Sequence, residues 1–304
     1  MNPIRIALFG DPAAVPHVAG VAGLKKKEIL VSRFDAKRPL AGTFALRGAS
    51  IAHGVMASSM WKIFSRAKKN GCLTVNHWIG TDVSQTLASK GLREQFRQTA
   101  PFFDAHWSVA PWLTEELYQL GIHAREVPIV SPSLEALPLP PPDRHLVLSY
   151  AQAGKEEFYG VSLLRDLAAK FPKVPFVLCG GGELPPGSPD NLKAVGFAKG
   201  RAMEAFYRGA SVLVRLPQHD GLSKMALDML ARGREVLWNH PLEGARLVRN
   251  AVEAQTALGE ILDKPPVENR RGRDLIAQKY SAQAVADRML SEYARLLDEA
   301  AARK

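Results

Sequence analysis

The chain has 304 residues, of which 46% are hydrophobic and 23% charged, a composition that supports about two globular domains with full cores. No apolar run approaches the ~20 residues that cross a bilayer, and the first residues lack the pattern of a signal peptide. Two cysteines in apolar stretches, Cys72 and Cys179, indicate reduced core residues of a cytoplasmic protein. The net charge of +10 suits an anionic partner, and equally a solvated basic surface.

In the first 130 residues, short apolar segments typical of strands alternate with segments of helical period. The expected strands are 4–9, 29–34, 50–53, 73–77 and 106–109, and the expected helices are 55–69, 83–98 and 111–120. Residues 131–143 then contain five prolines, which neither a helix interior nor a central strand accommodates. This segment is therefore predicted to be a linker.

The alternation restarts after the linker. The expected strands are 145–150, 174–179, 192–195, 211–216 and 235–238, and the expected helices are 158–171, 201–208, 222–231 and 281–303. Such alternation indicates parallel sheets covered by helices. The sequence therefore predicts an α/β protein with two Rossmann-like, doubly wound domains that face a cleft, one over residues 1–130 and one over 144–280.

The loop after the predicted strand 211–216 is the strongest candidate site, because doubly wound sheets bind ligands at the carboxyl ends of their strands. Gly221 allows a ligand to approach the backbone closely. Leu222, Ser223 and Lys224 are expected to present unpaired N–H groups at a helix N-terminus, where an anion is favoured. Lys224 adds a positive charge.

Two carboxylates lie on either side of this anion site. Asp220 directly precedes the helix, and Asp228 lies one to two turns inside it. The arrangement suits a ligand with hydroxyls, then phosphate, then hydroxyls, which is the layout of a nucleotide-sugar. The alternative is that Asp220 is an N-cap and Asp228 a solvated helix residue.

The segment "FYRGASVLVRLPQHDGLSKMALDMLARGREV" resembles the donor site of family-4 retaining glycosyltransferases of the GT-B fold. In that family one acid contacts the donor sugar and the second contacts the ribose, and the matching positions are Asp220 and Asp228. The resemblance extends over about residues 146–280, and implies that the backbone at Gly196 and Phe197 touches the base. It also implies that helix 281–304 packs back toward the first domain.

In the first domain, "TVNHWIGTDV" resembles the strand-end histidine segment of the same family. The resemblance implies that His77 lies by the donor sugar and that this domain binds the acceptor; a structural core histidine is the alternative. Asp82, five residues further on, is expected either to shape the loop or to touch the acceptor.

The chain departs from the family pattern at three positions. Both acids are aspartates where the family has glutamates, and Tyr159 stands where the family has a lysine that binds the diphosphate. Lys155 is the nearest basic substitute, and is expected either to contact the diphosphate or to be a solvated loop lysine. These departures motivate a second hypothesis, a degenerate GT-B protein that binds a nucleotide or a partner without turnover.

The preferred interpretation is a glycosyltransferase of polysaccharide or glycoconjugate synthesis, with a nucleoside-diphosphate-sugar as co-substrate and a carbohydrate or lipid-linked acceptor. No metal or other cofactor is expected, because the eight histidines have no ligand spacing with cysteines or acids and no DxD pair occurs. Residues 24–27, "LKKK", are either solvated or face an anionic membrane surface, and this would place the protein on the inner face of a membrane. No nucleic-acid partner is expected, since aromatic–basic motifs are missing from the sequence.

Overall fold

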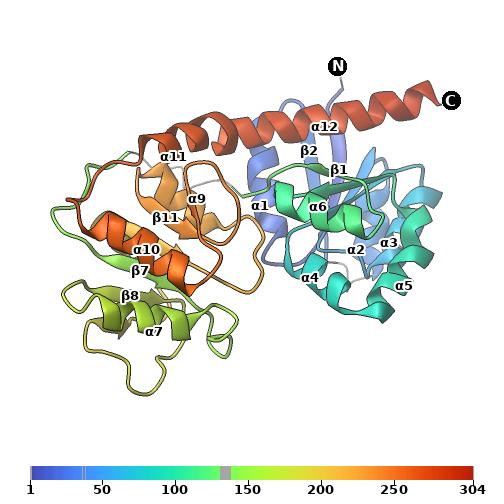
Figure 1. Ribbon diagram of the computed structural model, residues 1–304. Helices are drawn as coiled ribbons and strands as arrows, with labels where there is room; N and C mark the ends of the chain where they lie inside the picture. The colour runs from blue at the N-terminus through green and yellow to red at the C-terminus, as the bar shows by residue number, and fades with distance from the viewer. Residues whose placement is uncertain (1, 36, 38, 131–137, 304) are drawn as a thin grey trace. The chain divides into compact units, whose positions relative to one another are not determined.

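The computed structural model describes residues 2–35, 37, 39–130 and 138–303 (Figure 1). The chain divides into two compact units: unit 1 comprises Met1–Ser131 and Tyr280–Lys304, and unit 2 comprises Pro132–Lys279. Each unit has its own six-stranded sheet in which neighbouring strands are parallel. The predicted α/β class with two Rossmann-like sheets is confirmed.

The sheet of unit 1 has the strand order β2-β1-β3-β4-β5-β6. Its central strands β1, β3 and β4 are buried over most of their length, and β4 buries the polar residues Thr74, Asn76 and His77. The strands are β1 (Ile4–Gly10), β2 (Ile29–Arg33), β3 (Ile51–Val55), β4 (Leu73–Trp78), β5 (Ala105–Ser108) and β6 (Ala124–Glu126). The helices are α1 (Val15–Ala22), α2 (Pro39–Leu46), α3 (Trp61–Lys69), α4 (Thr81–Ala88), α5 (Lys90–Thr99), α6 (Pro111–Gln119) and α12 (Ala282–Ala302), with short 3-10 turns at Gly23–Lys25 and Ala100–Phe102.

The sheet of unit 2 has the order β12-β11-β10-β7-β8-β9, the strand order of a Rossmann fold. One cluster of its core consists of buried aliphatic and aromatic side chains from the sheet and from helices α7 and α10. The strands are β7 (Val147–Tyr150), β8 (Phe176–Cys179), β9 (Leu192–Ala194), β10 (Val212–Arg215), β11 (Glu235–Trp238) and β12 (Arg246–Leu247). The helices are α7 (Val161–Lys170), α8 (Arg201–Gly209), α9 (Lys224–Ala231), α10 (Ala251–Leu262) and α11 (Arg270–Leu275), followed by a π-helical segment at Ile276–Tyr280.

Helix α12, red in Figure 1, belongs to unit 1 although it is encoded at the other end of the chain. Its N-cap Ser281 accepts a hydrogen bond from the N–H of Ala284, and the helix packs against α1. Glu292, almost fully buried, forms an ion pair with Arg125 at 2.8 Å, and the hydroxyl of Tyr293 lies 2.5 Å from Nδ1 of His53. These contacts join the last helix to the sheet of unit 1.

Two predicted helices differ from the structure. The predicted helix 83–98 is two helices, α4 and α5, because Ser89 between them has extended backbone angles and its hydroxyl caps α5 through the N–H of Leu92. The predicted helix 55–69 begins only at Trp61, since Met56 has a left-handed φ of +50°. Of the predicted linker 131–143, residues 131–137 lie outside the described residues, and 138–143 form neither helix nor strand.

Candidate functional site

The order of strands in unit 2 reverses between β7 and β10, so the loops that follow these two strands meet at the topological switch point. They are in direct contact, because the N–H of Gln218 donates to the carbonyl of Phe158 at 2.8 Å. Gly160 has a φ of +72°, and a Cβ there would lie 2.9 Å from the carbonyl oxygen of Leu216. A glycine is therefore required for the two loops to approach this closely.

Asp220 lies in the loop after β10 and is paired with Arg215, the last residue of that strand. The guanidinium donates from Nε to Oδ2 at 2.5 Å and from an Nη to Oδ1 at 2.9 Å, a bidentate arrangement. Trp238, which is opposite Arg215 in the β10–β11 register, donates its indole N–H to the same carboxylate at 3.2 Å. The alternative role of Asp220 as N-cap is not observed, because Ser223 is the N-cap of α9.

Arg215 is the charged centre of the switch point, with a side chain only 10% exposed. Burial lowers the pKa of its guanidinium, but the adjacent Asp220 carboxylate outweighs burial and raises the pKa above its usual value. The rings of Tyr150 and Tyr159 lie 6.0 and 5.6 Å from the guanidinium carbon. Tyr159, at the position of the family's lysine, thus packs beside an arginine from a different strand.

The predicted site residues did not include Arg215, Tyr159 or Trp238. The sequence did contain one signal for Arg215. It is a charged residue at the end of a buried apolar strand, at the edge where such sheets bind ligands. The pairing with Asp220, five residues later, depends on how the loop folds back.

The N-terminus of α9 follows directly after Asp220 and Gly221. Leu222 and Ser223 are buried, and the helix begins at Lys224, two residues later than predicted. The Ser223 hydroxyl accepts the N–H of Ala226 at 3.3 Å. The other N–H groups of the first turn have no partner within the helix, which makes this end favourable for an anion.

Asp228 is 3% exposed, so it is not the solvated helix acid that was the alternative, nor does it project freely toward solvent. Its Oδ2 accepts hydrogen bonds from Lys224 at 2.8 Å and from the Tyr207 hydroxyl at 3.2 Å. Arg232 lies 3.6 Å from Oδ1. The Lys224 side chain is 41% exposed, so the ammonium that covers Asp228 reaches solvent.

The remaining residues predicted for the donor site lie at the carboxyl ends of other strands in unit 2. Lys155 is exposed in the loop after β7. Gly196 and Phe197 follow β9, and the Gly196 carbonyl accepts the N–H of Gly180 after β8 at 2.9 Å. Phe197 is 71% exposed, which is unusual for a phenylalanine and offers a face for stacking.

His77 does not line a surface, and the expectation that its imidazole faces a ligand is wrong. The residue is fully buried within β4 of unit 1. Its Nε2 lies 2.7 Å from the carbonyl of Val127, which can only accept, and its Nδ1 lies 3.1 Å from Nε2 of His53. Burial lowers the pKa of His77 to about 3, so the ring is neutral and structural.

The described residues also bear on two predicted absences, a metal site and a membrane-spanning helix. Residues 2–35, 37, 39–130 and 138–303 contain no group of three or more His, Cys, Asp or Glu side chains placed to hold a metal ion. Within the same ranges, no helix combines the length and apolar character needed to cross a membrane.

The chain matches no protein-family model and no curated protein by sequence, but it matches solved structures over nearly its full length. A sucrose-phosphate synthase from Thermosynechococcus elongatus gives a TM-score of 0.76 at 16% identity, covering 97% of this chain and 99% of the other. HepE from Anabaena, in complex with UDP and glucose, gives 0.73 at 10% identity over 96% and 100%. TarM from S. aureus gives 0.63 at 12% identity over 79% and 55%. These proteins are GT-B glycosyltransferases, and the chain has the GT-B fold.

Proposed function

We propose that this chain transfers a sugar from a nucleoside-diphosphate-sugar to a hydroxyl group of a carbohydrate or lipid-linked acceptor. The observation that carries the proposal is the Arg215–Asp220 pair at the switch point, followed at once by the N-terminus of α9. A diphosphate requires cations and N–H donors, and a sugar requires hydrogen-bond acceptors. This loop offers all three within ten residues of chain. The GT-B fold, shared over the full length, supports the assignment.

In the proposed complex the diphosphate lies against the N–H groups of residues 221–224 and the guanidinium of Arg215, with Lys155 as a further cation. The base lies on the backbone at Gly196 and on the exposed ring of Phe197. Asp220 accepts a hydrogen bond from a hydroxyl of the donor sugar.

Lys224 has a particular role in this arrangement. Its ammonium now donates to Asp228 at 2.8 Å, but it belongs to the first turn of α9, beside the proposed anion. When a diphosphate binds, the ammonium turns toward the phosphate oxygens, and Asp228 is then open to the hydroxyls of the ribose. Nucleotide binding and exposure of the second acid are therefore coupled through one mobile side chain.

We further propose that transfer retains the anomeric configuration, as in the family whose donor segment this sequence resembles. Arg215, Lys224 and the helix N–H groups offset the charge of the leaving diphosphate without a metal ion. The context is synthesis of a polysaccharide or glycoconjugate at the cytoplasmic face of a membrane. The basic segment 24–27 provides peripheral contact with anionic lipid, although Lys25 is paired with Asp287 in unit 1.

A second candidate function is a GT-B protein that binds a nucleotide or a partner without turnover. The observation that favours it is that both acids already have cationic partners, Asp220 in Arg215 and Asp228 in Lys224 and Arg232. If Asp228 keeps its pairs in the complex, it does not contact the ribose, and the site lacks the second of the two carboxylate contacts with the donor.

The test is calorimetric titration with UDP, GDP, ADP and dTDP, beside an assay of nucleoside-diphosphate release from the matching sugar donors. UDP-glucose is the first donor to try, because HepE was solved with UDP-glucose. We expect one nucleotide to bind and its sugar donor to be turned over, with both lost in Arg215→Lys. Arg246→Lys, a matched change in β12 away from the switch point, is expected to leave both intact. Binding without turnover identifies the second function. Absence of nucleotide binding rules out the glycosyltransferase and the nucleotide-binding form of the second function.

A further inference from the structure

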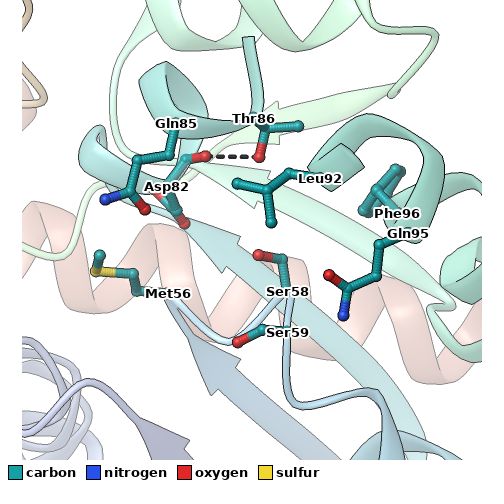
Figure 2. Close-up of a pocket in the computed structure, with 9 residues that line it drawn as sticks. All are labelled: Met56, Ser58, Ser59, Asp82, Gln85, Thr86, Leu92, Gln95 and Phe96. Carbon is teal, nitrogen blue, oxygen red and sulfur yellow. Dashed lines mark hydrogen bonds between the residues drawn. The ribbon is translucent and has the colours of Figure 1, made fainter. Parts of the chain in front are cut away.

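A cavity of about 130 Å³ lies in unit 1 at the carboxyl ends of β3 and β4 (Figure 2). Its walls are the loop after β3 and the helices α4 and α5. A water molecule takes up ~30 Å³ in the liquid, so the cavity has room for a few waters or for one edge of a small polar molecule.

Asp82 is the unusual residue of this cavity. It is 5% exposed, and its Oδ1 accepts the N–H groups of Ile79, Gly80 and Val83 at 3.0, 3.0 and 3.1 Å. Its Oδ2 is buried and has no hydrogen-bond partner among the described residues. Burial raises the pKa of the carboxyl to about 6, against the effect of the backbone N–H groups, so the group is ionised at pH 7 to 8. A buried carboxylate oxygen without a donor is costly, and a ligand that supplies one would remove that cost.

Four polar, uncharged side chains line the cavity around Asp82. Ser58 and Ser59 come from the loop after β3, Gln85 from α4 and Gln95 from α5. In Figure 2 they surround the space toward which the Asp82 carboxylate points. Hydroxyl and amide groups both donate and accept, which is what neighbouring hydroxyls of a carbohydrate require.

The lining also contains apolar side chains: Leu92 and Phe96 come from α5, and Met56, from the loop after β3, lies across the space from them in Figure 2. A carbohydrate has this mixed character, since its hydroxyls lie at the ring edge and its C–H groups at the ring face. Asp82 is the only ionisable side chain in the lining. A bare divalent cation is a poor fit, because it would have one carboxylate oxygen and neutral ligands only. An anionic ligand would meet an uncompensated negative charge.

The backbone at the rim supports a binding role. Met56 is the one non-glycine residue with positive φ in the described part of the chain, at +50°. It is held there by its N–H, which donates to the carbonyl of His77 at 2.9 Å. A left-handed conformation of a non-glycine residue costs free energy, and such conformations are concentrated at ligand-binding sites.

We propose that this cavity binds a hydroxyl-bearing edge of an uncharged carbohydrate, with one hydroxyl donating to Oδ2 of Asp82, and that it rejects anionic sugars. The inference rests on the proposed function in one respect: in a glycosyltransferase, this carbohydrate is the acceptor. Asp82 is then a residue that selects the acceptor by its charge, and the two glutamines and two serines set the pattern of hydroxyls that fits.

The experiment is a titration of the full-length, isotope-labelled protein, followed by NMR at the amides of Gly80 and Val83. The probes are glucose, galactose, mannose, N-acetylglucosamine and sucrose, with gluconate and glucose 6-phosphate as anionic counterparts. We expect at least one neutral sugar to shift these two amides saturably, and neither anion to do so. Asp82→Asn, which keeps the size and the Oδ1 acceptor, should weaken binding about tenfold, the lower end for losing a charged hydrogen-bond partner.

Two further variants make the result decisive. Ser59→Trp fills the cavity from its exposed rim without touching the hydrogen bonds of Asp82, and should abolish binding even if Asp82→Asn proves unstable. Asp104→Asn, an aspartate of unit 1 that pairs with Lys68 and accepts the N–H of Thr74 away from the cavity, should bind the sugar as the parent does.

Three outcomes overturn the proposal: no shift at Gly80 and Val83 with any neutral sugar, equal binding by Ser59→Trp, or tighter binding of an anion. The nucleotide titration above separates this result from the proposed function. If unit 2 binds a nucleotide and the cavity binds no sugar, only the present inference fails. If the cavity binds a sugar and no nucleotide binds, the carbohydrate site stands and its role as acceptor site does not.

Discussion

Arg215 donates two hydrogen bonds to the carboxylate of Asp220, across the end of β10 and the loop that follows it. Their side chains are only 10% and 12% exposed, so water solvates both charges poorly and each is stabilised mainly by the other. Asp220 therefore has two roles in the proposed enzyme. It holds the guanidinium at the switch point, and it accepts a hydrogen bond from the donor sugar.

The first prediction concerns the stability of this pair. Asp220→Ala leaves a buried guanidinium without its counter-ion and should lower the free energy of unfolding by about 3–5 kcal/mol. Replacing both partners by apolar residues, Arg215→Met with Asp220→Leu, should recover most of that loss. The measurement is urea unfolding at pH 7, and Asp166→Ala, an exposed acid on α7, should change little. A double variant as unstable as Asp220→Ala would show that the pairing is not what stabilises the loop.

The second prediction concerns Asp228 and the lysine that covers it. Asp228→Ala should weaken nucleoside-diphosphate affinity by roughly ten- to a hundredfold, because a hydrogen bond to a charged group contributes about 1.5–3 kcal/mol. Lys224→Met should also weaken binding. The double variant should lose less binding free energy than the sum of the two single losses, because both substitutions act through one exchange of partners. Calorimetry of the single and double variants measures this. Full additivity of the two losses would contradict the coupled movement of Lys224.

The third prediction concerns acid sensitivity of unit 1. Burial, and next the charge of His77, hold the pKa of His53 well below its usual range, and burial lowers the pKa of His77 to about 3. Both rings stay neutral in the folded protein while the unfolded chain takes up protons below about pH 6.5. The free energy of unfolding should therefore fall as pH drops from about 6.5 toward 3.

Substitution of one of the two imidazoles tests this assignment. His77→Gln retains a donor for the Val127 carbonyl but removes one titrating ring, so its unfolding free energy should depend less steeply on pH over the same range. Tyr293→Phe removes the hydroxyl beside His53 and should lower stability at all pH values with the slope nearly unchanged. Denaturant unfolding at several pH values gives both slopes, and parallel curves for parent and His77→Gln would refute the assignment.

The fourth prediction concerns Asp82, whose ionisation should change stability with pH in the direction opposite to that of the two histidines. Its pKa is raised from 3.8 to about 6, so the folded protein binds a proton more tightly than the unfolded chain does. This contribution to stability is full at low pH and is lost as pH rises through about 6. Asp82→Asn should therefore be more stable than the parent at pH 7.5, by on the order of 2 kcal/mol. Thermal unfolding at pH 7.5 and pH 4 checks this, and a gain that is equal at both pH values would mean that ionisation is not the cause.

The sequence predicted the sheets because buried parallel strands are short apolar runs between turn residues, and β10 followed by α9 has this pattern without ambiguity. It also located the loop that contains Asp220. It failed where local backbone conformation interrupts a regular pattern: Ser89, with extended backbone angles, divides one predicted helix in two, and another begins only after the turn that contains the left-handed Met56. Helices α1, α2, α10 and α11 and strands β6 and β12 were not predicted.

The side-chain contacts around the site could not be predicted from the sequence, for a different reason. His77 ends the predicted strand, and only the partners on β3 and α12 show that this strand is central and covered on both faces. Arg215 pairs with Asp220 only because a loop folds back, and Tyr159 packs beside it from the loop before α7, over fifty residues earlier in the chain. Spacing along a chain does not specify which side chains meet across loops.

Unit 1 is completed by α12, whose Tyr293 and Glu292 contact residues more than 160 positions earlier in the chain. During synthesis on a ribosome, every strand of the first sheet is made before the helix that buries His53 and pairs with Arg125. Unit 2, continuous from Pro132 to Lys279, has all of its sequence available sooner. The half that is translated first is therefore completed only after unit 2 has been made, and a nascent chain must keep its first sheet partly uncovered until α12 has been translated.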